Sequence, residues 1–124
     1  MTSDCRYCEA HAIRVAERYG SSEDRMNHIW EYKTYAAFTE GERAAFDLAI
    51  AASQVPNVVN DTIAEKARLY WEEAEIVEIM GVVALFGYLN RWNDSMGTEL
   101  EGPATVSAQS ILGHRGLTSR KHQY

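Results

Sequence analysis

Residues 73–89 read EAEIVEIMGVVALFGYL, and this strongly apolar stretch decides the fold class. From Ile76 onward, apolar side chains occupy positions nearly all round a helix instead of a single stripe. A helix of this kind is typically buried on every side, so we expect a central helix. Because a chain of 124 residues has few other elements to cover it, we also expect another subunit to cover its far side.

The segments around this helix show helical signals as well. We expect further helices to begin at side chains that can cap a first turn, namely Ser21 or Ser22, Thr39 with Glu42 in a capping box, and Asn60 or Asp61. The first of these should continue to about Lys33. No segment alternates apolar and polar residues with a period of two, so the sequence predicts an all-α fold.

The reactive chemistry is concentrated in Cys5-Arg6-Tyr7-Cys8-Glu9-Ala10-His11, which should open a first helix capped by Ser3 or Asp4. Residues three apart are neighbours on a helix surface, so the sulfurs of Cys5 and Cys8 can approach disulfide distance. The positive end of the helix dipole favours a thiolate. We therefore expect at least one thiol to be more nucleophilic than a free cysteine.

His11 follows Cys8 by three residues, so its ring should reach the second sulfur as a base or a charged partner. Two other readings of the pair stay open, a zinc site and inert burial. Zinc would need further ligands, and His28, His114 and His122 each stand alone in the sequence. The redox reading is favoured, with Cys5, Cys8 and His11 as catalytic residues and with no metal or cofactor expected.

Composition limits the class of the protein, its possible partners and its expected location. Apolar residues make up 46% and charged residues 24%, which is ordinary for one globular domain. A net charge of −6 disfavours nucleic acid as a partner. No signal peptide or membrane span is visible, so a cytoplasmic location is expected. We expect a helical domain over residues 1–101 and a basic, irregular tail over residues 102–124, with at most a short helix near residues 106–112.

The stretch Cys5-Arg6-Tyr7-Cys8-Glu9-Ala10-His11 resembles the active-site motif of the carboxymuconolactone decarboxylase family, in its alkylhydroperoxidase D-like branch. Residues 38–45 and 75–94 resemble further helices of that family. The resemblance implies an AhpD-like helical bundle that assembles as homo-oligomers, either trimers or hexamers. It also implies a thiol-dependent peroxidase, in which Cys8 attacks a peroxide, Cys5 resolves the product, and a thiol or disulfide protein restores the pair.

Two departures from the family pattern shape the expected activity. Ala12 stands where many members carry a histidine, and the family's upstream helix with its relay glutamate is absent. We therefore expect a bundle that lacks the family's first helices and an impaired peroxidase. The alternative is a non-catalytic oligomeric scaffold or binding protein of the same family. Lactone decarboxylation is a weaker third reading, since that branch does not depend on a CxxC pair.

Overall fold

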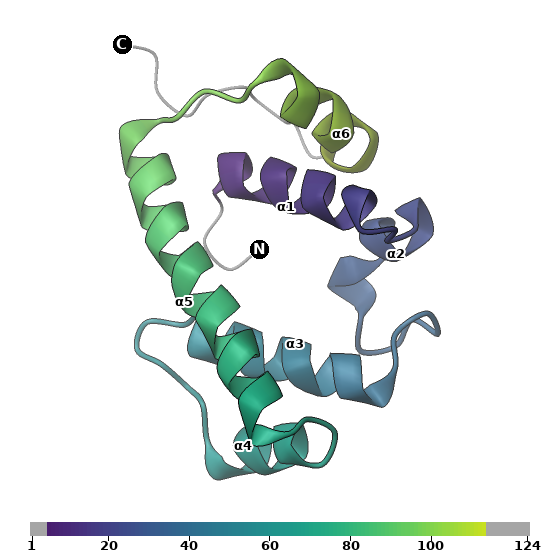
Figure 1. Ribbon diagram of the computed structural model, residues 1–124, viewed down its shortest axis with the longest axis vertical. Coiled ribbons are helices and arrows are strands. Elements are labelled where there is room, and N and C mark those ends of the chain that lie inside the picture. Colours follow the sequence, from purple (N-terminus) through teal and green to yellow (C-terminus); the bar gives the residue numbers. More distant parts are fainter. Residues whose placement is uncertain (1–4, 114–124) are drawn as a thin grey trace. The chain divides into compact units, whose positions relative to one another are not determined.

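The computed structural model describes residues 5–113, and within them every regular element is a helix (Figure 1). In chain order the elements are α1 (Arg6–Arg18), α2 (Glu23–Asn27), the 3-10 helix η1 (Ile29–Glu31), α3 (Glu40–Ala52), α4 (Asp61–Arg68), α5 (Glu73–Met96) and α6 (Gly102–Leu112). The predicted all-α class is confirmed. The described residues form two compact units, one with residues 5–29 and 88–113 and the other with residues 30–87.

Local capping rules explain where several helices begin. The Thr39 hydroxyl accepts a hydrogen bond from the Glu42 backbone N–H at 3.2 Å, and the Glu42 carboxylate accepts one from the Thr39 N–H at 2.9 Å. This is the predicted capping box. Ser22 caps α2 and Asn60 caps α4, also as predicted. The first helix differs, because its N-cap is Cys5, whereas Ser3 and Asp4 lie outside the described residues.

The helix expected from Ser22 to about Lys33 is wrong in length, since α2 ends at Asn27 and only the short η1 follows. In this segment, aromatic contacts and not helical spacing determine the backbone conformation. The rings of Tyr32 and Phe38 meet that of Phe46 edge to face, with centroids 5.2 and 5.8 Å apart. Because Tyr32 and Phe38 are both buried, these tertiary contacts favour the irregular backbone over a longer helix.

The predicted burial of α5 is not reached within the described chain, and its expected cover by another subunit stays a prediction. The helix forms where expected and continues to Met96, but none of its residues is buried in the described chain. Val77, Val82 and Leu85 are each more than half exposed. The apolar pattern of residues 73–89 therefore predicted the helix correctly, while the elements described here leave much of its apolar surface uncovered.

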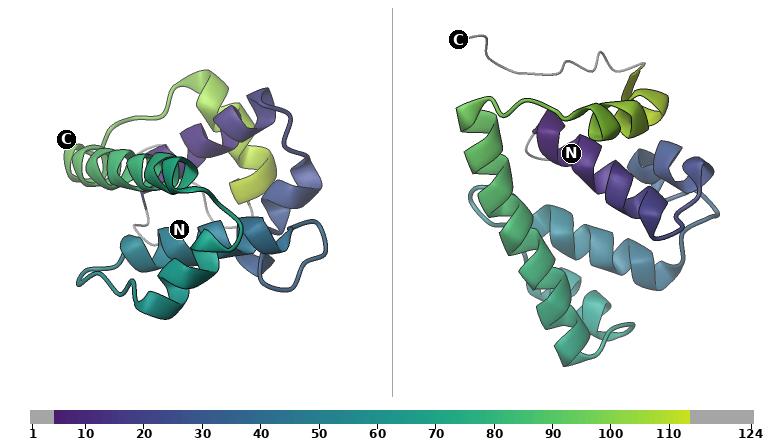
Figure 2. Two further views of the ribbon diagram at one scale, coloured as in Figure 1. Left: turned by 60° about the horizontal axis from the view of Figure 1, so that its bottom comes forward. Right: turned by 45° about the horizontal axis from the view of Figure 1, so that its top comes forward.

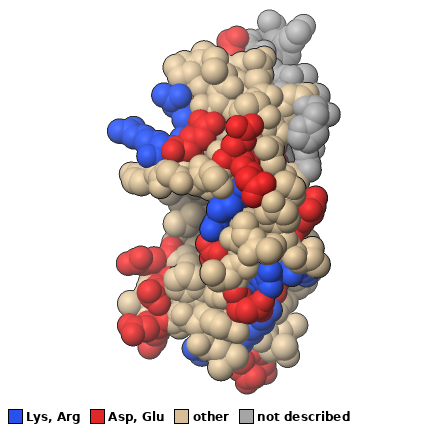
Figure 3. Space-filling model, turned by 90° about the vertical axis from the view of Figure 1, so that its right-hand side faces the viewer, with Lys and Arg blue, Asp and Glu red and all other residues tan. Residues whose placement is uncertain are grey.

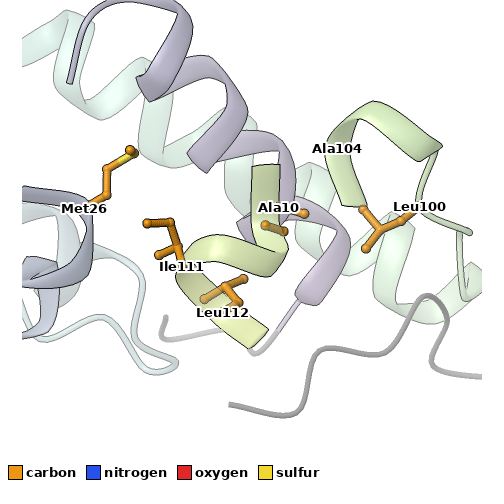
Figure 4. Close-up of a cluster of buried hydrophobic side chains, with 7 residues drawn as sticks. Ala10, Met26, Leu100, Ala104, Ile111 and Leu112 are labelled. Carbon is orange, nitrogen blue, oxygen red and sulfur yellow. The ribbon is translucent and has the colours of Figure 1, made fainter. Parts of the chain in front are cut away.

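The unit formed by residues 5–29 and 88–113 has α1 and α6 side by side (Figures 1 and 2). Its core, shown in Figure 4, consists of Ala10, Met26, Leu100, Ala104, Ala108, Ile111 and Leu112. The small side chains of Ala10 and Ala108 are fully buried, which allows the two helix backbones to approach closely. Residues 102–112 are thus not an irregular tail, which corrects the predicted boundary at residue 101. Residues 114–124, with the basic side chains of the predicted tail, lie outside the described residues.

Surface charge and helix length are relevant to the predicted partners and cellular location. On the face drawn in Figure 3, Lys and Arg side chains are interspersed among Asp and Glu side chains. None of the helices in residues 5–113 combines the length and the apolar character that crossing a membrane requires. The absence of a nucleic-acid partner and the cytoplasmic location stay predictions.

The unit of residues 30–87 contains a polar hub at Asp47. Its carboxylate accepts hydrogen bonds from the Tyr32 hydroxyl at 2.6 Å and from Lys66 at 3.3 Å, and Lys33 lies 3.6 Å away. Partial burial opposes ionisation, but these partners outweigh it and lower the pKa of Asp47. The hub joins the segment before α3 to α3 and α4.

We expect Asp47→Asn to lower the free energy of unfolding by about 1–3 kcal/mol, because charge-assisted bonds are lost. The lowered pKa means that the stabilisation is complete above the ordinary aspartate pKa and is lost as pH falls through the lowered value. Urea unfolding followed by tryptophan fluorescence measures it, since Trp30 and Trp71 lie in this unit. Glu65→Gln on exposed α4 surface is the control. Equal stability of the two variants at neutral pH would contradict the role of the hub.

Candidate active site

The two cysteine sulfurs lie together at the start of α1. Cys5 is the N-cap, with an extended backbone, and Cys8 lies in the first turn. Their Sγ atoms are 2.6 Å apart, and the Cys8 backbone N–H donates to the Cys5 sulfur at 3.4 Å. Both residues are free thiols and both are buried, with 1% and 6% of their surface exposed. A disulfide bond is about 2.05 Å long, so the predicted proximity is confirmed and bond formation requires only a small movement.

The environment of Cys8 disfavours its thiolate. Burial, followed by the hydrogen bond and the field of Cys5, raises the pKa of Cys8 to about 12, and Asp94 acts in the same direction. The side-chain amide of Asn93, whose Nδ2 lies 3.9 Å from the Cys8 sulfur, opposes the shift only in part. The expected activation by the helix start is therefore wrong for Cys8, because removal from water outweighs the helix dipole.

This environment predicts an unusual pH dependence of alkylation. Since the thiolate is the reactive form, the rate of Cys8 alkylation by iodoacetamide should rise about tenfold per pH unit between about pH 8 and about pH 10. In urea-unfolded protein the same rate should level off once the ordinary cysteine pKa is passed. Peptide mass mapping distinguishes Cys8 from Cys5. A plateau near pH 9 in the folded protein would show that the burial of Cys8 has no such effect.

His11 lies on the same helix but binds oxygen atoms. Its Nδ1 is 2.9 Å from the Tyr7 carbonyl oxygen, and its Nε2 is 3.1 Å from Oε2 of Glu101. The ring also stacks on Tyr7, with centroids 4.2 Å apart. Both nitrogens are thus directed to Tyr7 and Glu101, which corrects the expected contact with the Cys8 sulfur. The catalytic role of His11 stays a prediction.

Glu101 is the site residue that sequence reasoning missed. Besides its contact with His11, it accepts a hydrogen bond from the Tyr7 hydroxyl at 3.2 Å. A bond from its own backbone N–H, followed by the Tyr7 hydroxyl and the charge of His11, outweighs a smaller effect of burial and lowers the pKa of Glu101. Tyr7 and Glu101 are 94 positions apart, so no local motif signals the pairing. Only the placement of α6 on α1 brings them together.

The described residues do not provide a set of ligands for the zinc site that was considered as an alternative. Within residues 5–113 there is no cluster of three or more His, Cys, Asp or Glu side chains able to hold a metal ion. His114 and His122, which that reading would require as additional ligands, lie outside the described residues.

Solved structures of a debrominase are similar to this chain. No protein-family model matches the chain. The crystal structure of the debrominase Bmp8 is similar, with a TM-score of 0.80 and 28% identity, covering 89% of this chain and 59% of that one. A cysteine-to-alanine variant of that debrominase in complex with 2,3,4-tribromopyrrole gives a TM-score of 0.81 and 27% identity, with the same coverage.

A curated relative is the uncharacterized protein YnjA of Escherichia coli (strain K12), which is 27% identical over 99 residues. These residues make up 79% of this chain and 54% of YnjA. The chain therefore spans little more than half the length of the proteins it resembles. The comparisons support the helical fold, while membership of the carboxymuconolactone decarboxylase family stays a prediction.

Proposed function

We propose that the chain is a cysteine-dependent redox enzyme in which Cys5 and Cys8 reduce a small electrophile and are oxidised to a disulfide. The observation that carries the proposal is the buried sulfur pair with its 2.6 Å separation. The likeness to a debrominase supports an enzyme, since a variant of that protein with one cysteine replaced was crystallised with 2,3,4-tribromopyrrole.

The first substrate class is a hydroperoxide. The Cys8 sulfur attacks one peroxide oxygen, the O–O bond breaks, and the departing oxygen takes a proton to become an alcohol. The Cys5 sulfur then attacks the sulfenic acid at Cys8, which forms the disulfide and releases water. Two thiols and one hydroperoxide thus yield one disulfide, one alcohol and one water. An external dithiol protein returns the two electrons.

The second substrate class is a bromoarene, and the ligand of the debrominase variant favours it. Two thiols and one bromoarene yield the disulfide, the arene carrying hydrogen in place of bromine, a bromide ion and a proton. The thiols supply both electrons in this reaction as well. The two classes therefore share the cysteine pair and differ in the bond that breaks.

Turnover with dithiothreitol as the reductant tests the proposal. Cumene hydroperoxide consumption and bromide release from 2,3,4-tribromopyrrole are measured separately, each against a Cys5→Ser/Cys8→Ser double variant. We expect at least one substrate to be consumed faster by the wild-type chain. Equal background rates with both substrates would contradict the enzyme and favour the non-catalytic scaffold.

We also propose that copies of the chain associate through α5. Val77, Val82 and Leu85 are 65%, 56% and 54% exposed, and burial of apolar surface contributes roughly 25 cal/mol per Å². Large exposed apolar surface commonly marks an interface. We expect sedimentation at micromolar concentration to show a homo-oligomer, and Val82→Glu to weaken it. A well-folded wild-type monomer would contradict this assembly.

A further inference from the structure

Asn93, in the last turn of α5, contacts the Cys8 sulfur. Its side-chain Nδ2 donates a hydrogen bond to Cys8 Sγ over a distance of 3.9 Å. Both partners are shielded from the solvent, since Cys8 is 6% exposed and Asn93 is half-buried. The two residues are 85 positions apart in the sequence and belong to the same compact unit. A polar side chain from a distant helix thus faces the sulfur pair at the start of α1.

The end of α5 holds the Asn93 backbone in place. The Thr98 N–H donates a hydrogen bond to the Asn93 carbonyl at 3.1 Å, and Gly97 has a left-handed backbone with a φ of 60°. This is a Schellman closure of the helix, which suits glycine because a positive φ meets no Cβ. Leu100, two residues after Thr98, is buried in the core that contains Ala10 of α1 (Figure 4). The last turn of α5 is therefore tied to the helix that carries both cysteines.

The Asn93 bond favours one protonation state of Cys8. A neutral thiol sulfur is a weak acceptor, whereas hydrogen bonds to charged acceptors are shorter and roughly twice as strong as those between neutral groups. The amide therefore stabilises the thiolate more than the thiol, and it acts to lower the pKa of Cys8. Burial above all, with Cys5 and Asp94, acts the other way, so the pKa of Cys8 stays at about 12. Two adjacent side chains of α5 thus have opposite effects on one sulfur.

We propose that the Asn93 amide is the group that stabilises the anionic Cys8 sulfur as it forms for attack on the substrate. This role rests on the proposed function. The S–H bond of Cys8 breaks, its proton leaves to a base in the solvent, and the electron pair stays on the sulfur. The amide keeps its own proton and shares it with the negative sulfur in a hydrogen bond. Because this bond strengthens as the charge develops, it favours the reactive form over the resting thiol.

Other titratable groups surround the start of α1, and they come from three helices. They are Cys5, Tyr7 and His11 of α1, Asp94 of α5, and Glu101 at the N-cap of α6. Burial, then Glu101 and finally the charges of the cysteines raise the pKa of Tyr7, so its hydroxyl keeps its proton at neutral pH. His11 and Glu101 are directed to each other, 3.1 Å apart. Substitutions at Asn93 leave all of these groups in place.

Alkylation of Cys8 by iodoacetamide between about pH 8 and about pH 10 tests this role without any turnover. The range lies below the pKa of Cys8, so a change in that pKa displaces the whole plot of log rate against pH. We expect Asn93→Leu to react roughly tenfold more slowly than the wild type at every pH, because a hydrogen bond to a charged group is lost. Asp94→Asn should react faster, since it removes a charge that disfavours the thiolate. Asn90→Leu, the same substitution one turn earlier on α5, should match the wild type.

The direction of the change separates loss of the donor from damage to the packing. Burial is the largest cause of the raised Cys8 pKa, so a variant that loosens the end of α5 would expose the sulfur and speed its alkylation. Asn93→Asp, which keeps the side-chain shape but places a carboxylate beside the sulfur, should react even more slowly than Asn93→Leu. Wild-type or faster rates in both variants would overturn the proposal. If thermal unfolding shows that Asn93→Leu does not fold, the order of Asn93→Asp, wild type and Asp94→Asn decides.

Single-turnover oxidation by cumene hydroperoxide, or by 2,3,4-tribromopyrrole, connects the effect to the chemistry. Thiol loss in Asn93→Leu should slow by about the same factor as alkylation at the same pH, since both reactions begin with the Cys8 thiolate. Equal oxidation rates of the wild type and Asn93→Leu would overturn the role of the amide in the reaction. If neither reagent oxidises the wild-type thiols while alkylation follows the expected order, only the proposed function is rejected, and the stabilisation of the thiolate by Asn93 is supported.

Discussion

Replacement of Cys8 by serine is expected to lower electrophile reduction by about 10³-fold or more, because the attacking sulfur is removed. Cys5→Ser should behave differently. It leaves the attacking sulfur in place but removes the resolving one, so one equivalent of hydroperoxide should oxidise Cys8 to a sulfenic acid that no disulfide relieves. Dimedone labelling followed by mass spectrometry detects that acid. The two variants thus assign the order of attack that the family resemblance implies for this pair.

The structure provides the control for this comparison. Cys5 is the N-cap of α1 and its sulfur accepts a bond from the Cys8 N–H, a role that serine fills well. Cys5→Ser should therefore keep the helix start and the thermal midpoint close to those of the wild type. If Cys8→Ser retains the wild-type rate while folded, the assignment of Cys8 as the attacking sulfur is wrong. If Cys5→Ser alone loses the first oxidation step, the two roles are reversed.

The second large effect is expected in the core. Ile111→Ala should lower the free energy of unfolding by about 2–5 kcal/mol, since it removes three carbons from a side chain that is only 4% exposed and leaves a cavity. Val106→Ala on the same helix should change it by less than about 0.5 kcal/mol, because that side chain is 72% exposed. Urea unfolding followed by circular dichroism measures both. A difference within error between the two variants would show that α6 does not belong to the folded core.

The predictable parts of the fold depended on short-range rules. Thr39 with Glu42 satisfies a capping box within one turn, and Asn60 caps α4 in the same local way. The spacing of Cys5 and Cys8 similarly placed the sulfurs on one face of a helix. In each case the residues that decide the structure lie within a few positions of one another, so their arrangement can be derived without the rest of the chain.

The parts that could not be predicted depend on contacts between distant segments. The sequence of α6 begins with Gly102-Pro103, which suggested irregular chain, yet proline is well suited to a first helical turn. Two of its four buried residues are alanines, which give only a weak apolar signal. The burial that raises the pKa of Cys8 and the pairing of Glu101 with His11 follow from how the helices meet. Likewise, the apolar pattern of residues 73–89 indicated a helix without showing what covers it.

If Cys5 and Cys8 form a redox pair, an oxidising substrate should remove both free thiols from the folded protein. Folded protein is treated with one equivalent of cumene hydroperoxide and, in a parallel sample, with one equivalent of 2,3,4-tribromopyrrole, and free thiols are then titrated in denaturant. We expect at least one reagent to remove both thiols of each chain, and dithiothreitol to restore them. Two free thiols per chain persisting after both treatments would contradict the redox pair.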